Sequence, residues 1–246
     1  MFKIEFVIFC TDRIAGDGLT PMNSTPSIPR YSASEESLNV TSHAIGFALS
    51  IIATLALMER GIASAEANYL VSFSIFGFSL LFLYGSSTIY HRTKNIDRRV
   101  KLRILDHSSI YVLIAGTYTP FTLITLQGTT GWVIFSVSWA MALTGITLKL
   151  FFTGKFKLLS TLMYVFMGWL IVFAIGPLID KLSSQGMSWL VAGGLSYTLG
   201  AVLYSIKKIP FNHAIFHLFV LLGSGCHFVA VYFYVVWTAS SRGEIQ

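Results

Sequence analysis

The chain has 246 residues, of which 54% are hydrophobic and only 11% carry a charge. Soluble domains contain about 25% charged residues, so a chain this poor in charge cannot cover its surface in water. The formal net charge of +6 comes from short basic clusters between apolar runs, which is the pattern of membrane-protein loops. The composition therefore predicts one integral membrane domain with little soluble mass, and it argues against a soluble enzyme and against nucleic acid as a partner.

Residues 1–34 are predicted to form a flexible cytoplasmic tail. The apolar run at residues 1–10 is too short to span a bilayer, is interrupted by Glu5 and lacks the anatomy of a signal peptide. Residues 11–34 are rich in Thr, Ser, Pro and Gly, a composition typical of irregular segments. We therefore divide the chain into this tail and a transmembrane domain at residues 35–246.

The transmembrane domain is predicted to be an all-α, polytopic bundle. A bilayer core about 30 Å thick requires roughly 20 apolar residues of helix, and the apolar runs do not alternate as barrel strands do. Pro120 is expected to kink the third helix. Seven segments are long and apolar enough, at residues 38–58, 69–91, 103–126, 131–152, 158–178, 187–206 and 211–238.

The charges of the loops predict the orientation of the bundle. Only Arg60, Lys181 and Arg242 lie on the side that holds the odd-numbered loops and the C-terminus. Because basic loops stay in the cytoplasm, the N-terminus is expected inside, the C-terminus outside, and the protein in the inner (plasma) membrane. The even-numbered loops hold most of the basic residues, namely Arg92, Lys94, Arg98, Arg99, Lys101, Arg103, Lys149, Lys155, Lys157, Lys207 and Lys208.

Ionisable residues within the predicted spans are the candidates for function, because such residues are costly in a membrane. His91 ends the second span, Asp106 begins the third, and His213 and His217 begin the seventh. With the predicted topology, these four residues reach one depth near the cytoplasmic face. The other histidines within the spans are His43, His107 and His227.

The spacing of these residues is suited to a metal site. His213 and His217 are four residues apart on one helix face, so both imidazoles could bind one ion, and His91 could supply a third nitrogen. Three histidines with a fourth position for water form an open, catalytic type of zinc site, which lowers the pKa of the water to about 7. Asp106 could then accept a hydrogen bond from that water, and Ser87, one turn from His91, could polarise a substrate carbonyl.

A structural interpretation of the same residues is equally compatible with the sequence. An H-x-x-x-H pair alone is weak evidence, histidines near span ends often meet headgroups, and Asp106 could pair with Lys101 or Arg103. His107 points about 100° away from Asp106 and is expected to pack. His227 lies about 15 Å along the helix from His217, too far to share its metal, and is interpreted as structural.

Four separated motifs resemble the hemolysin III family of bacterial membrane proteins. That family is related to the adiponectin and progestin receptors and more distantly to the alkaline ceramidases, and the resemblance covers roughly residue 30 to the C-terminus. The motifs are EESLNVTSHAIG at 35–46, SSTIYH at 86–91, LDHSSIYVLIAGTYTPF at 105–121 and NHAIFHLFVLLGSGCHF at 212–228.

The resemblance implies seven helices with the N-terminus inside, and a zinc ion held by three histidines near the cytoplasmic side. On this chain the histidines correspond to His91, His213 and His217, and the neighbouring aspartate and serine correspond to Asp106 and Ser87.

A further motif of the family, in the first span, corresponds to Glu36, Asn39, His43 and Gly46, and its role is not evident from the sequence. Because the residues that correspond to the zinc site are all of the matching type, the resemblance favours a zinc site over a purely structural set of histidines.

The predicted function is a zinc-dependent lipid hydrolase that cleaves an amide or ester bond, or a membrane-homeostasis protein that uses such a site. Membrane lipids are the expected partners, as substrate or as ligand. Two alternatives stay open: a pore-forming haemolysin that causes cytolysis, and a lipid-sensing receptor without catalysis. A pore is disfavoured because no span carries a continuous polar stripe.

Overall fold

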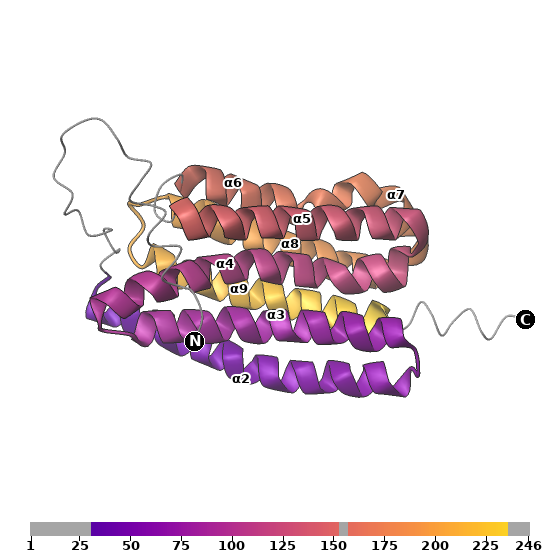
Figure 1. Ribbon diagram of the computed structural model, residues 1–246, viewed down its shortest axis with the longest axis horizontal. Helices are drawn as coiled ribbons and strands as arrows, with labels where there is room; N and C mark the ends of the chain where they lie inside the picture. Colours follow the sequence, from indigo (N-terminus) through magenta and orange to yellow (C-terminus); the bar gives the residue numbers. More distant parts are fainter. Residues whose placement is uncertain (1–30, 153–156, 236–246) are drawn as a thin grey trace, which may run out of the picture.

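A computed structural model describes residues 31–152 and 157–235, and within these ranges the chain folds into a bundle of helices. Seven helical segments are long and apolar enough to cross a membrane, which confirms the predicted all-α, seven-span fold class. The helices lie side by side along the long axis of the molecule (Figure 1). Residues 1–30, most of the predicted tail, fall outside the described ranges.

The bounds of the elements extend the predicted spans by a few residues at most ends. The π-helix η1 continues α4, the 3₁₀ helix η2 joins α6 to α7, and the π-helix η3 continues α9. The elements are α2 (Ala33–Ala63), α3 (Ala67–Arg92), α4 (Ile96–Pro120), η1 (Phe121–Leu126), α5 (Gly128–Phe152), α6 (Lys157–Gly168), η2 (Leu170–Ala174), α7 (Ile175–Lys181), α8 (Ser184–Ser205), α9 (Asn212–Val229) and η3 (Ala230–Val235).

The fifth span differs from the single helix that we predicted at residues 158–178. It is interrupted between α6 and α7, because Pro177 has no amide hydrogen to donate to a carbonyl one turn earlier. Tyr118 of α4 bridges the interruption: its hydroxyl donates to the Gly168 carbonyl and accepts from the Ile171 amide, both at 2.9 Å. These bonds satisfy backbone groups that lipid could not.

The third span changes its helical type at Pro120, where we expected a kink. The α-helix ends at this residue and continues as the π-helix η1, because proline cannot complete the regular ladder of backbone bonds. At its other end α4 begins at Ile96, seven residues before the predicted start at residue 103. The Asn95 side chain caps it by accepting from the Arg98 amide at 3.0 Å. Asp106 therefore lies in the third turn of α4.

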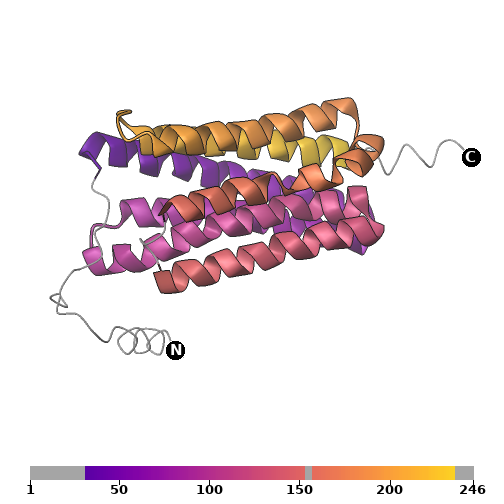
Figure 2. The same cartoon turned by 90° about the horizontal axis from the view of Figure 1, so that it is seen from above.

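Close helix packing gives the bundle its order. α2 packs against α3 and α9, α4 packs between α3 and α5, and α8 packs against α9 (Figure 2). Glycines permit this contact: a Cβ atom at Gly145 would lie 2.3 Å from the Tyr111 ring, and one at Gly46 would lie 2.5 Å from the Tyr84 ring. The span formed by α4 and η1 is the most enclosed of the seven.

The two ends of the bundle carry different residues. We call the end that holds the α3–α4 and α8–α9 connections the basic end, and the other the far end (Figure 1). The last turn of α3 and the first turns of α2, α4 and α9 meet at the basic end. The fold therefore brings His91, Asp106, His213 and His217 to the same end of the molecule, as the topology predicted.

Candidate metal centre

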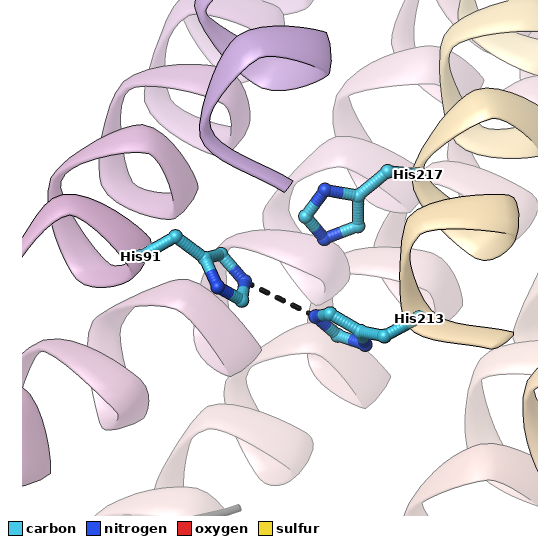
Figure 3. Close-up of side chains that lie close together, drawn as sticks. All are labelled: His91, His213 and His217. Atoms are coloured by element: carbon cyan, nitrogen blue, oxygen red, sulfur yellow. Dashed lines mark hydrogen bonds between the residues drawn. The ribbon is translucent and has the colours of Figure 1, made fainter. Parts of the chain in front are cut away.

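Three histidines from two helices form a buried cluster at the basic end. His91 lies in the last turn of α3, and His213 and His217 lie in the first two turns of α9. Their side chains point into one common space (Figure 3), and one nitrogen from each ring lies within 4.8 Å of the others. All three residues are at least 94% buried, with exposed fractions of 2%, 6% and 2%. Among the described residues, this is the group of histidine, cysteine and acidic side chains that could hold a metal ion.

The turn before α9 sets the direction of its two histidines. Phe211 takes the left-handed conformation with φ of 56°, which reverses the chain directly before the helix. The Asn212 side chain then donates to the Tyr204 carbonyl at the end of α8, at 2.9 Å. His213 and His217 follow one helical turn apart, with ring centroids 4.5 Å from each other. The spacing that suggested a metal site thus produces two neighbouring rings on one face.

The distance between two of the ring nitrogens fits a metal ion. Nε2 of His91 and Nε2 of His213 are 3.1 Å apart (Figure 3). In a tetrahedral zinc site with Zn–N bonds of about 2.0–2.1 Å, two nitrogens lie about 3.3 Å apart. A proton shared by the two rings would also explain this distance. A proton, however, needs only two nitrogens, whereas His217 brings a third into the same space.

Residues of α2 accept hydrogen bonds from Nδ1, the outer nitrogen, of two of these rings. The Glu36 carboxylate lies 3.2 Å from Nδ1 of His91, and the Asn39 backbone carbonyl lies 3.3 Å from Nδ1 of His217. A carboxylate and a carbonyl both accept, so each Nδ1 carries the proton that it donates. The lone pair of each ring is then on Nε2, the atom through which a histidine held in this way binds a metal.

Ser87 and Asp106 border the cluster without belonging to the group of three. The Ser87 side chain is 1% exposed, and its hydroxyl lies within hydrogen-bonding reach of the Asp106 carboxylate. Asp106 is 8% exposed and lies close enough to Ser87 and to His91 for electrostatic interaction. A buried hydroxyl and a buried carboxylate beside three histidines fit a site that receives a further polar group.

Two aromatic residues next to the cluster were not assigned a role from the sequence. His43 of α2 stacks on His217 with ring centroids 3.5 Å apart, and Tyr31 stacks on His213 at 4.8 Å. Burial raises the pKa of the Tyr31 hydroxyl well above its usual range, so this ring covers the cluster as a neutral group. Tyr31 lies in the segment that we assigned to the tail.

A periodic signal could have identified the contribution of α2. Glu36, Asn39 and His43 are spaced by three and four residues, which places them on one face of an otherwise apolar helix. Tyr31 had no such signal, because it precedes the helix and contacts residues far along the chain.

His107 and His227 lie outside the cluster, as the sequence predicted. His227 stacks on Tyr197 at a centroid distance of 5.3 Å and lies against Gly193 of α8. His107 is half-buried on α4, and its backbone carbonyl accepts from the Tyr164 hydroxyl at 2.9 Å. Neither is among the three residues whose nitrogens converge.

Comparison with known proteins places the chain in a family. The sequence profile of the family described as "Haemolysin-III related" matches residues 31–228, which include all the residues of the cluster. The chain belongs to this family. The resemblance noted from the four motifs is therefore confirmed.

Curated relatives of the haemolysin-III-related family align over most of their length. "Hemolysin-3" of Bacillus cereus is 47% identical over 206 residues, which are 84% of this chain and 94% of the relative. "Hemolysin-3 homolog" of Bacillus subtilis (strain 168) is 48% identical over 206 residues, 84% of this chain and 97% of the relative. "Monocyte to macrophage differentiation factor" of Homo sapiens is 28% identical over 243 residues, with 95% and 94% covered. The similarity thus extends from bacterial to animal proteins.

Proposed function

We propose that this protein is a zinc-dependent hydrolase embedded in the membrane, which cleaves an amide or ester bond of a lipid. The observation that carries the proposal is the group of three buried histidines whose nitrogens converge within 4.8 Å. Three histidine nitrogens would hold an ion and leave it one position for water, as in catalytic zinc sites, whereas structural sites are fully ligated by protein. The hydroxyl of Ser87 and the carboxylate of Asp106 supply further polar groups beside this set.

Each residue of the site has a distinct part in this reaction. His91, His213 and His217 hold the ion, which when bound makes a water molecule nucleophilic at neutral pH and polarises a carbonyl group. Asp106 orients the water and takes its proton as the water oxygen attacks the carbonyl carbon. Ser87 donates a hydrogen bond to the carbonyl oxygen, where negative charge develops. The proton on Asp106 then passes to the leaving nitrogen or oxygen as its bond to the carbonyl carbon breaks, releasing a fatty acid.

The position of the cluster along the helices supports a lipid as substrate. His91 is one residue from the end of α3, and His217 lies about 8 Å along α9 from its first residue. The cluster is therefore near the level where membrane-spanning helices leave the hydrocarbon, which is also where the ester and amide bonds of lipids lie. An acyl chain in the bilayer and its carbonyl group at this depth could reach the site without leaving the membrane.

The orientation and location of the bundle belong to the same proposal. The basic loops favour a cytoplasmic basic end, with the N-terminus inside and the C-terminus outside the inner (plasma) membrane. Reporter fusions test this orientation. A phosphatase that is active only outside the cytoplasm should work when fused after Gln246 and should fail when inserted at Lys155. The reverse result would place the histidine cluster at the outer face.

The test of catalysis compares the wild type with Asp106→Asn in nanodiscs that contain ceramide or phospholipid. We expect fatty acid release by the wild type, and a rate lower by about 10²–10⁴-fold in the variant, the usual cost of losing a general base. Metal content should stay close to that of the wild type, since the three histidines remain. Asp97→Asn is the matched control, because Asp97 is exposed in the first turn of the same helix, and its rate should not change.

Leakage of a dye trapped in vesicles, measured in parallel, separates the alternatives. Release of fatty acid without leakage would support the hydrolase. Leakage that persists unchanged in Asp106→Asn would contradict it in favour of a pore, which would agree with the word hemolysin in the name of the Bacillus cereus relative. Saturable lipid binding with no product from any substrate would instead indicate a lipid sensor with a structural metal.

A further inference from the structure

The carboxylate of Glu36 is the acidic group in hydrogen-bond contact with the histidine cluster, and neither the proposed reaction nor the sequence gives it a role. It lies on α2, a helix that contributes no metal-binding residue to the cluster. One of its oxygens, Oε2, lies 3.2 Å from Nδ1 of His91, whose side chain is fully buried. Its other oxygen, Oε1, accepts a hydrogen bond from the Arg99 guanidinium at the start of α4.

We infer that Glu36 is a positioning residue, which holds His91 with the proton on Nδ1 and the Nε2 lone pair directed at the metal. This inference rests on the metal site proposed above and adds a residue to it. Imidazole can carry its proton on either nitrogen, and only the form protonated on Nδ1 can bind a metal through Nε2. A carboxylate that accepts from Nδ1 selects this form, fixes the ring and makes Nε2 a stronger donor.

The contacts around Glu36 keep it in place for this task. Arg99 binds one oxygen and the Asn39 side chain donates to the other at 3.4 Å, so the carboxylate is held from both sides. The guanidinium of Arg99 also lies over the Tyr90 ring, 5.1 Å from its centroid, and Tyr90 directly precedes His91 on α3. Three helices therefore meet through this one carboxylate: α2 supplies it, α4 supplies its cation, and α3 presents the ring that it orients.

An ordinary ion pair at the ends of helices is the competing explanation of the same contact. In that case Glu36 would pair with a doubly protonated His91, and its loss would weaken the fold without a specific effect on the metal. The third ring argues against this view, because a proton between Nε2 of His91 and Nε2 of His213 needs only those two nitrogens, whereas His217 brings another nitrogen into the same space. A proton on Nε2 of His91 would point into the space that the three nitrogens share.

The affinity for Zn²⁺ tests the inference, measured on purified protein by competition with a chromophoric chelator. Loss of an outer partner of a metal-binding histidine typically lowers affinity about 10–100-fold. We expect Glu36→Ala to lose an amount in this range, and Glu36→Gln to lose less because the amide oxygen still accepts a hydrogen bond. Glu35→Gln is the matched control: Glu35 is the preceding residue of α2, and its variant should bind Zn²⁺ as the wild type does.

A second measurement needs no change at Glu36 and so does not depend on how its variants fold. In metal-free wild type at mildly alkaline pH, ¹⁵N NMR should show the proton of His91 on Nδ1, with its signal assigned by its loss in His91→Gln. A proton found mainly on Nε2, or Zn²⁺ affinity unchanged in Glu36→Ala, would overturn the positioning role while leaving the metal site intact. A wild type that binds no Zn²⁺ would instead overturn the metal site itself, and the inference with it.

Discussion

The two ends of α9 hold buried histidines in contrasting surroundings. At the basic end, His213 and His217 face His91 across the contact with α3, and their nitrogens converge. About three turns further along the same helix, His227 is equally enclosed, with an exposed fraction of 7%. Its ring lies against Gly193 of α8 and stacks on Tyr197, and no further histidine or acid of the described residues comes near enough to form a metal-binding group. Burial alone therefore does not distinguish the two regions.

What separates the two regions is whether the nitrogens of several rings converge on one point. In the half of α9 towards the far end, the Tyr84 hydroxyl donates to Ser224 at 2.8 Å and the Tyr197 hydroxyl lies 2.9 Å from the same serine. These groups satisfy one another and close the contact between helices α3, α8 and α9. At the basic end, Glu36 and Asn39 engage the outer nitrogens of two rings and leave the inner ones aimed at one point. Ring nitrogens that point to one place are typical of a metal-binding site.

The largest effect that distinguishes the two ends should be on metal content. We expect the double variant His213→Ala, His217→Ala to lose nearly all its zinc, because His91 alone cannot hold an ion. His227→Ala should retain about one zinc per chain, although it leaves a cavity beside Tyr197. Elemental analysis of the purified proteins measures both. Full zinc occupancy in the double variant would show that the metal binds elsewhere in the protein.

Gly193→Ala should produce the opposite pattern, a loss of stability with the metal retained. A Cβ atom at this position would lie 1.9 Å from Cδ2 of the His227 ring, so the ring or helix α8 must move. Overpacking of this kind typically costs about 1–3 kcal/mol. Thermal unfolding in detergent measures the loss, and elemental analysis measures the zinc. Gly194→Ala is the control, since a Cβ atom there comes no closer than 3.8 Å to the Trp169 ring. Equal unfolding temperatures for the two variants would contradict the tight contact.

Most of this contrast could be predicted from the sequence, because it depends on features of single helices: the length of each apolar run and the spacing of residues along it. Apolar runs of about 20 residues define the spans, and the spacing of His213 and His217 on one helix places two rings on one face. The distance of His227 from them follows from the rise of the helix alone. The convergence with His91 required only the direction of each span, which alternates along the chain.

Contacts between distant segments could not be read from the sequence in the same way. The stacking of His43 on His217 joins residues more than 170 positions apart, and it depends on how α2 rotates against α9. The interruption of the fifth span depends on a bridging hydroxyl, that of Tyr118, from another helix. The role of Glu36 depends on its reach to α3. Such features are set by tertiary packing, which hydropathy and spacing do not encode.

The smallest effect that we predict concerns Tyr31, which precedes α2 and stacks on His213 with centroids 4.8 Å apart and planes 17° from parallel. An aromatic pair of this kind contributes about 0.5–1.5 kcal/mol beyond burial, and 1.4 kcal/mol corresponds to tenfold in affinity. Tyr31→Leu should therefore weaken Zn²⁺ binding by roughly 2- to 10-fold, because the His213 ring loses the surface that holds its plane. Tyr31→Phe keeps the ring and should bind Zn²⁺ as the wild type does. His227→Phe, which changes the buried histidine at the other end of α9, should also leave the affinity for Zn²⁺ unaltered. Chelator competition on the same preparations measures all three, and an equal affinity in Tyr31→Leu and Tyr31→Phe would show that the stack covers the cluster without orienting it.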